Sequence, residues 1–156
     1  IDIKPLKLTK ANDFVSSYVL NLVAVTEIIR SFQDNLKKNK GSIVLFSTVA
    51  AKKGFANHSI ISSAKAAVEG LTVALAAELS PNIRINCIAP SLTKSKIASA
   101  VIKNSTIEES IAKMHPLKRI GEGIDSANLA NFLLTEKSSW ITGQIIGVDG
   151  GRSNIA

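Results

Sequence analysis

The chain has 156 residues, of which 46% are hydrophobic and 20% are charged. This composition is ordinary for a globular α/β protein, and the length allows one domain at most, with room for a hydrophobic core. We find no repeats and no low-complexity segment. The net charge is +7, but the lysines form no single block and no aromatic residues interleave with them, so we expect no nucleic-acid partner.

The first predicted element is a long helix from about Lys10 to Lys38, with Thr9 as its N-terminal cap. Its apolar residues recur at steps of three and four, which predicts one buried helix face. That face comprises Phe14, Tyr18, Leu22, Val25, Ile29, Phe32 and Leu36. A continuous apolar run, Ile43–Phe46, follows and is typical of a parallel strand that is buried on both faces.

Helices and strands alternate along the rest of the chain. The remaining predicted elements are a helix at 59–79, a strand at 83–89, a helix-rich segment at 95–114, a helix at 125–134 and a strand at 144–148. Ser80 and Pro81 end the first of these helices. Strands that alternate with helices predict an α/β fold with a parallel sheet.

The cysteine content and the apolar stretches bear on the cellular setting. The chain has one cysteine, Cys87, which cannot form an internal disulfide, so we expect a reducing compartment and a cytoplasmic protein. We find no stretch of about 18 consecutive apolar residues and no signal-peptide pattern, so we expect no membrane-spanning helix.

A hydroxyl ends the first predicted strand at Thr48, and Lys65 lies one to two turns into the next helix. This arrangement resembles the active-site core of the short-chain dehydrogenase/reductase family. Three further segments resemble family motifs, in the family's order and spacing. They are Ile85–Pro90, Pro116–Glu122, and Ile141–Gln144 together with Val148–Gly151.

The resemblance implies a doubly wound, Rossmann-like parallel sheet, of which residues 1–156 are the C-terminal portion of a single domain. Family members begin with a glycine-rich turn that seats the pyrophosphate of a dinucleotide, and this chain has no such turn. The opening segment, Ile1–Leu6, resembles the family segment that follows the fourth strand. Three strands alone would leave one edge of the sheet open.

Family members use an Asn, a Ser, a Tyr and a Lys in catalysis. Asn21 matches the Asn and Lys65 the Lys, while Thr48 lies at the Ser position, with its neighbour Ser47 as the alternative. The tyrosine position, four residues before the lysine, is occupied by Ile61, which can neither donate nor accept a proton. The resemblance therefore implies a hydride-transfer fold without its usual proton donor.

His58 is the candidate substitute for the missing acid. It lies seven residues before Lys65, so the two face the same way if the helix reaches back that far, and histidine titrates near neutral pH. The alternative is that His58 belongs to a loop and points to solvent. We interpret the second histidine, His115, as structural or exposed.

The family's cofactor contacts carry over to the end of the second strand. The resemblance assigns cofactor binding to Lys65, Pro90, Ser91, Leu92, Thr93 and Ser95. Ser91 replaces the usual glycine and Ser95 the usual threonine, so a hydroxyl is kept and backbone freedom is lost. The expected cofactor is NAD or NADP, and we expect no metal.

These residues support two functional hypotheses. The first is an NAD(P)-dependent oxidoreductase acting on the carbonyl or hydroxyl group of a small-molecule substrate, with an atypical or impaired site. The alternative is a catalytically inactive member that binds a nucleotide or a protein.

The long first helix and the alanine-rich helix after His58 resemble the family's dimer interface, and the region of Trp140 resembles a second contact. We therefore expect a homodimer or homotetramer.

Overall fold

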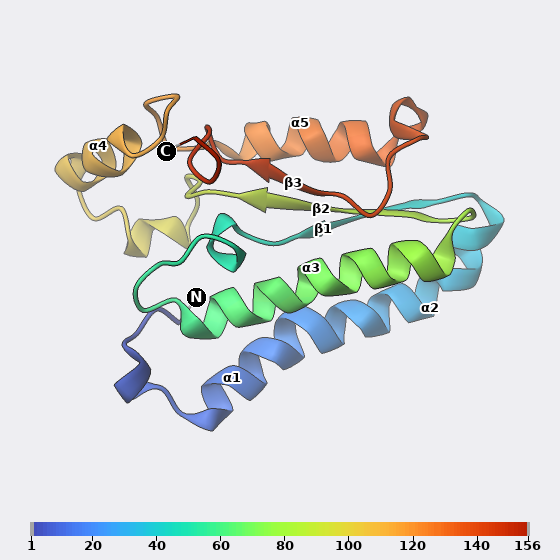
Figure 1. Cartoon of the computed structure of the whole chain (residues 1–156), viewed down its shortest axis with the longest axis horizontal. Helices are drawn as coiled ribbons and strands as arrows, with labels where there is room; N and C mark the ends of the chain where they lie inside the picture. Colours follow the sequence, from blue (N-terminus) through green and yellow to red (C-terminus); the bar gives the residue numbers. More distant parts are fainter. Residues whose placement is uncertain (1, 156) are drawn as a thin grey trace.

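The three predicted strands form a parallel sheet with helices on both sides of it (Figure 1). The computed structural model describes residues 2–155, so Ile1 of the opening segment lies outside the described residues. The strand order is β1-β2-β3, with bounds Ser42–Phe46, Arg84–Pro90 and Ile145–Val148. The predicted α/β fold with a parallel sheet is confirmed. Within the described residues β1 pairs on one side only, so it forms an edge of this sheet.

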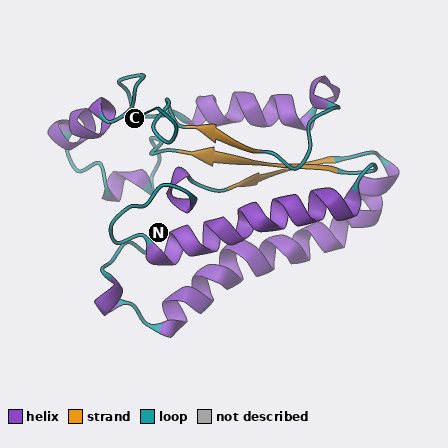
Figure 2. Ribbon diagram, viewed as in Figure 1, coloured by secondary structure: helices purple, strands orange, loops and turns teal. Residues whose placement is uncertain are grey.

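The predicted first helix forms as one continuous rod in three parts (Figure 2). These are α1 at Ala11–Tyr18, a π-helical turn at Val19–Val23 and α2 at Ala24–Lys38. The prediction that Thr9 caps this rod is wrong. The Thr9 hydroxyl donates to the carbonyl of Leu6, while the Asp13 carboxylate accepts from the backbone N–H of Lys10 at 2.7 Å. Because the Thr9 hydroxyl is bonded within the preceding turn, the N-cap is the next residue, Lys10.

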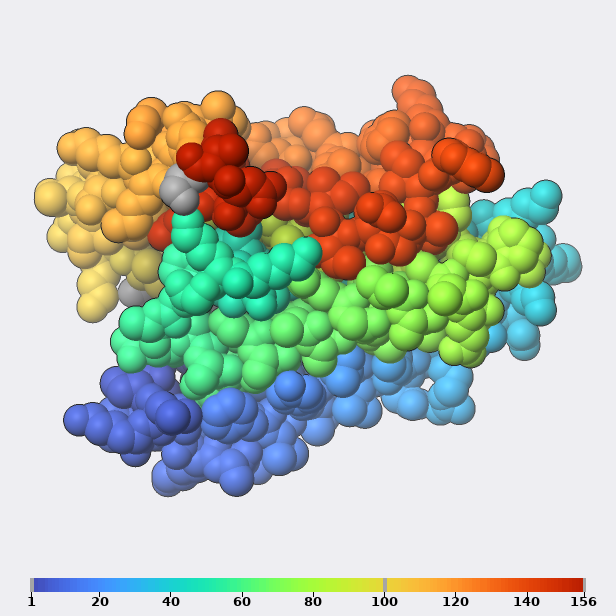
Figure 3. All heavy atoms as spheres, viewed as in Figure 1, coloured from blue at the N-terminus to red at the C-terminus, as the bar shows by residue number. Residues whose placement is uncertain are grey.

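The buried face of this rod is smaller than its periodicity predicts. Ile29 is buried as predicted, but Phe32 is 58% exposed. The rod lies against α3 and forms the outermost layer, so one side of it faces solvent along its whole length (Figure 3). Its exposed apolar residues are Val15, Val19, Leu20, Val23, Ile28 and Phe32.

The helix α3 spans Ser59–Leu79, with the predicted bounds, and packs between that rod and the sheet. Ala64, Val68, Thr72 and Ala76 form its buried face, whereas Ala74 is exposed. The Thr72 hydroxyl bonds to the carbonyl of Val68 at 2.8 Å, which satisfies it within the core.

The central strand β2 is the most deeply buried part of the described chain. Ile85, Cys87 and Ile88 are inaccessible to solvent, and burial raises the pKa of the Cys87 thiol to about 11. Asn86 joins β2 to the loop before β3, because its amide donates to the carbonyl of Ile141 at 2.9 Å and its oxygen accepts from the backbone N–H of Gln144. These bonds fix the position of the third strand.

The remaining helices lie on the other side of the sheet and at its carboxyl end. The predicted segment 95–114 contains a 3₁₀ turn and α4, which spans Ser105–Lys113 and is capped by the side chain of Asn104. The helix α5 spans Gly123–Leu134 and begins two residues before the predicted start. Asp125 lies in its first turn, and the side-chain bond from Arg119 lowers the pKa of that carboxyl to about 2.

Two helical stretches, Ala11–Lys38 and Ser59–Leu79, are long and apolar enough to cross a membrane by length and composition. The expectation of no such helix rested on the absence of an unbroken apolar run, and both stretches contain scattered polar residues. The second stretch is the core helix α3, and core helices share this length and composition. The first stretch carries the exposed apolar residues of the outer layer.

Two adjacent leucines at the end of α5 provide a test of the packing. Leu133 is fully buried, whereas Leu134 is 52% exposed. We expect Leu133→Ala to lower the free energy of unfolding by about 2–5 kcal/mol through lost burial and a cavity. The matched change Leu134→Ala should have a much smaller effect in the same urea titration. Equal effects of the two substitutions would contradict the position of α5 on the sheet.

Candidate active site

Lys65 lies on α3 beside the carboxyl end of β1. Its ammonium donates a hydrogen bond of 2.9 Å to the backbone carbonyl of Phe46, the last residue of that strand. Burial lowers the pKa of Lys65, because partial desolvation disfavours the charged form. The ammonium is therefore directed to the edge where parallel sheets of this kind bind their ligands.

A second polar contact joins α3 to the same strand end. The Ser47 hydroxyl lies 2.8 Å from the carboxylate of Glu69 and 3.2 Å from the backbone carbonyl of Lys65. Ser47 and Glu69 are both buried. The sequence analysis missed Glu69, although a carboxylate one turn after the lysine, on an otherwise apolar helix, was a visible signal. This contact engages the Ser47 hydroxyl, which makes Ser47 the weaker of the two candidates for the serine position.

Thr48 and Asn21 lie where local structure changes. Thr48 follows β1 and caps a 3₁₀ turn, its hydroxyl oxygen accepting from the N–H of Ala50 at 3.3 Å. Asn21 is in the π-helical turn, and its amide donates to the carbonyl of Ser17 at 2.9 Å. This bond uses the amide nitrogen and leaves the side-chain oxygen of Asn21 as an acceptor. Turns of this type within α-helices are frequent at functional sites.

Ile61 and His58 lie before Lys65 along α3. Ile61 is one turn away, so its side chain and that of Lys65 project from the same face of the helix. His58 is the N-cap residue of α3 and is partly buried. Its Nδ1 lies 2.7 Å from the carbonyl of Ala56, and its ring centroid lies 5.5 Å from that of Phe55. The carbonyl requires a proton on Nδ1, which leaves Nε2 as an acceptor in the neutral ring.

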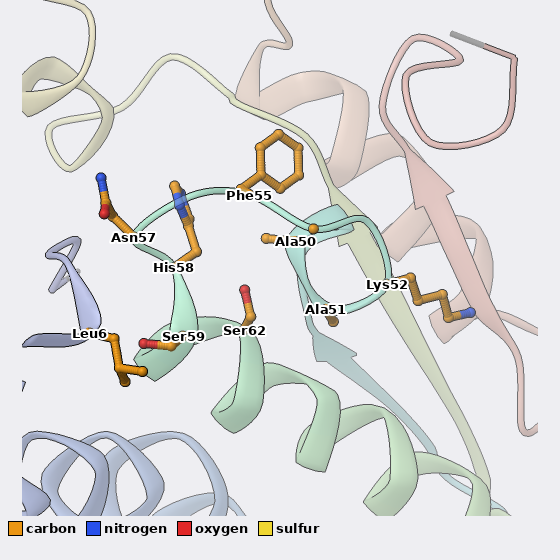
Figure 4. A pocket seen from close by; sticks show the side chains of 10 residues that line it. Leu6, Ala50, Ala51, Lys52, Phe55, Asn57, His58, Ser59 and Ser62 are labelled. Carbon is orange, nitrogen blue, oxygen red and sulfur yellow. The ribbon is translucent and has the colours of Figure 1, made fainter.

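A cavity of about 280 Å³ opens beside the first turn of α3 (Figure 4). His58, Ser59 and Ser62 line it from the helix side, and Ala50 and Phe55 line it from the loop that follows β1. The Ser62 hydroxyl points from α3 towards that loop. Asn21, Thr48 and Lys65 do not line this cavity. The structure thus brings Lys65 and Thr48 to the end of β1 and places His58 at an adjacent hollow.

Apart from Lys65, the predicted cofactor residues begin at Pro90, the last residue of β2, and continue into the loop that follows it, next to the end of β1. The Thr93 hydroxyl donates to the carbonyl of Ser91 at 3.0 Å, and Ser95 accepts from the N–H of Ala98 at 3.1 Å. The Ser91 hydroxyl lies 2.8 Å from Nε2 of His115. His115 is buried, so the expectation that it is exposed is wrong.

No group of three or more His, Cys, Asp or Glu side chains in the described part of the chain is arranged to hold a metal ion. At the end of β1 the described residues offer the hydroxyl of Thr48 and the partly desolvated ammonium of Lys65. Groups of these types can donate hydrogen bonds to a polar ligand.

Comparison with known proteins agrees with this arrangement. The family model described as Enoyl-(Acyl carrier protein) reductase matches residues 2–153. A chloroplastic tropinone reductase homolog of Arabidopsis thaliana is 36% identical over 152 residues, which are 96% of this chain and 47% of that protein. Dehydrogenase/reductase SDR family member 4 of Homo sapiens is 39% identical over 116 residues, or 74% of this chain and 42% of that protein.

Solved structures show the same fold. A short-chain type dehydrogenase/reductase from Mycobacterium ulcerans superposes with a TM-score of 0.90 at 29% identity, over 98% of this chain and 56% of that one. ElxO with NADP bound gives 0.88 at 30% identity, over 97% and 62%. The chain spans about half the length of the curated relatives named above. On the family match and these identities, the chain belongs to the short-chain dehydrogenase/reductase family of oxidoreductases.

Proposed function

We propose that the intact protein is an NAD(P)-dependent oxidoreductase of the cytoplasm that acts on the carbonyl or hydroxyl group of a small molecule. In this proposal residues 1–156 are the C-terminal portion of a single dinucleotide-binding domain. The observation that carries it is the Lys65 ammonium, 2.9 Å from the carbonyl at the end of β1, on a fold whose relatives are dehydrogenases and reductases. The lone buried Cys87 supports the reducing compartment.

The residues present fit a nicotinamide nucleotide. Ligands of open parallel sheets bind outside the carboxyl ends of the strands, and Lys65 and Thr93 lie at the ends of neighbouring strands. Lys65 would hold the ribose, and the segment Pro90–Ser95, with Pro90, Ser91, Leu92, Thr93 and Ser95, would hold the carboxamide end. The nicotinamide supplies or accepts the hydride when bound. The related ElxO has NADP or NADPH bound, which supports this cofactor class for the chain.

The chain's own residues would handle the substrate oxygen and its proton. Thr48 would donate a hydrogen bond to the carbonyl oxygen and so polarise it. His58, or a water held by the free oxygen of Asn21, would deliver the proton that a tyrosine delivers in most of the family. The Nδ1 bond to Ala56 orients the His58 ring and directs Nε2 away from that carbonyl.

The second candidate function is binding without turnover, to a nucleotide or a protein partner. Ile61 is the observation that favours it, because the side chain four residues before Lys65 is a hydrocarbon that cannot donate a proton. In this case the ammonium and the hydroxyls would hold the nucleotide, and no group would complete the proton transfer.

Placing a tyrosine at position 61 distinguishes catalytic turnover from binding without turnover. We expect Ile61→Tyr to raise the turnover number for carbonyl reduction by ~10²–10⁴-fold, the usual contribution of a positioned general acid. The control Ile61→Phe adds the same ring without the hydroxyl and should leave turnover unchanged. The measurement is NAD(P)H oxidation with a panel of aldehydes and ketones. An equal rise in both variants would assign the effect to packing and not to proton donation.

Binding and proton delivery are expected to lie on different residues. His58→Gln should abolish turnover and leave the dissociation constant for NAD(P)H unchanged, because His58 lines the cavity beside α3 and not the end of β1. Lys65→Met should weaken nucleotide binding as well as turnover. Fluorescence titration of the nucleotide and steady-state rates measure the two effects. Unchanged kinetics in His58→Gln would remove this histidine from the mechanism.

We propose that the outer layer formed by α1, the π-helical turn and α2 is the contact surface of a homodimer or homotetramer. Its six exposed apolar side chains form a row along one helical rod, and isolated monomers rarely leave such a surface uncovered. The fully exposed Trp140 beside β3 supports a second contact on the far side of the sheet.

Light scattering tests this assembly. We expect the molar mass of two or four chains in solution and a shift to one chain in Leu20→Asp, because Leu20 is the most exposed apolar residue of the rod. The control Asn35→Asp adds a charge at an exposed polar position on α2 and should keep the wild-type mass. A monomeric wild-type protein would contradict the proposal.

A further inference from the structure

A buried serine and a buried histidine meet on the far side of β2 from the proposed proton donors. Ser91 is 9% exposed and follows β2, and His115 is 1% exposed and follows α4. Nε2 of His115 lies 2.8 Å from the Ser91 hydroxyl, and Nδ1 lies 2.8 Å from the carbonyl of Ile111. No role proposed above uses the imidazole of His115.

The partners of this ring determine where its proton lies. A carbonyl only accepts, so Nδ1 carries the proton, and Nε2 of the neutral imidazole is the acceptor. The Ser91 hydroxyl must then donate to Nε2. A serine that gives its proton to an imidazole, which is in turn oriented by a third group, is the arrangement of an activated nucleophile.

The pair opens onto a cavity of its own. Ser91 and His115 line a space of about 400 Å³ that shares no lining residue with the cavity beside His58. Leu117 and Val148 give it apolar walls. This volume is in the range that binds small molecules.

Donors for a developing negative charge line the same cavity. The Arg119 guanidinium bonds to Asp125 at 2.7 and 2.8 Å and to the carbonyl of Ile120 at 3.2 Å, and two of its five N–H groups remain beyond these. Asn128, on α5, also lines the cavity. N–H donors of this kind stabilise the oxyanion that forms when a carbonyl is attacked.

We propose that Ser91 and His115 form a second catalytic site, which hydrolyses a small acyl ester without any nicotinamide nucleotide. Oγ of Ser91 bonds to the acyl carbon while its proton passes to Nε2 of His115. The ester C–O bond then breaks, and the departing alkoxide takes that proton and leaves as an alcohol. A water molecule attacks the acyl-serine, gives a proton to Nε2 and releases the carboxylic acid, and the proton returns to Ser91. No atom is oxidised or reduced.

The test uses the intact protein and two probes, a fluorophosphonate and 4-nitrophenyl acetate. Peptide mass mapping should find the phosphonyl adduct on Ser91 and not on Ser47, a comparably buried serine whose hydroxyl faces a carboxylate instead of an imidazole. Ester hydrolysis should fall at least ~100-fold in Ser91→Ala and in His115→Asn, the usual effect of losing a nucleophile or its base. The matched variant Ser126→Ala, with a serine 8% exposed, should retain the wild-type rate.

Several results would overturn the proposal. They are an unmodified Ser91 in the folded wild-type protein, adducts spread equally over Ser91 and Ser47, or labelling that survives in His115→Asn. If His115→Asn does not fold, the wild-type adduct map and Ser91→Ala decide alone. Because neither probe needs NAD(P), failure of the proposed oxidoreductase function would leave this outcome unaffected.

Discussion

The attachment of α3 to the end of β1 is the constraint on which the candidate site depends. Two polar contacts make it: the Lys65 ammonium bonds to the carbonyl of Phe46, and the Ser47 hydroxyl bonds to the Glu69 carboxylate. Below them the inaccessible Ala64 permits close approach of the helix to the sheet. Apolar burial holds the helix at the sheet, and the polar pairs fix its position along the strand. The packing of α3 therefore fixes the Lys65 ammonium at the carboxyl end of β1, the edge where parallel sheets bind ligands.

This arrangement separates the parts of a dehydrogenase site that usually act together. The groups suited to holding a nucleotide lie at the ends of β1 and β2, on elements fixed by the core. The candidate for proton delivery, His58, is the N-cap residue of α3 and lines a different cavity. Between His58 and Lys65 lies Ile61, whose side chain is a hydrocarbon. In the proposed function, nucleotide binding would therefore depend on elements fixed by the core, and proton delivery on a residue at the end of a loop.

Much of the fold follows from local pattern. The bounds of α3 were predictable because a periodic apolar face ends at a proline. The strands were predictable because each is a short, mainly apolar segment between helices. The turn at Asn21 was not, because a π-helical turn leaves the spacing of apolar residues almost intact while changing the backbone bonds. Phe32 was misplaced because periodicity identifies an apolar face without showing what covers it. Ser91 and His115 are 24 residues apart, and no sequence spacing links them.

The chain contains a single tryptophan, and its indole is 99% exposed beside the strand β3. An indole in water emits at long wavelength, and the emission moves to the blue when a surface covers the ring. The ring stays exposed to solvent when this chain folds alone, so its emission wavelength should change little when the core unfolds. The same side chain is an intrinsic optical reporter for whatever associates with that edge of the molecule.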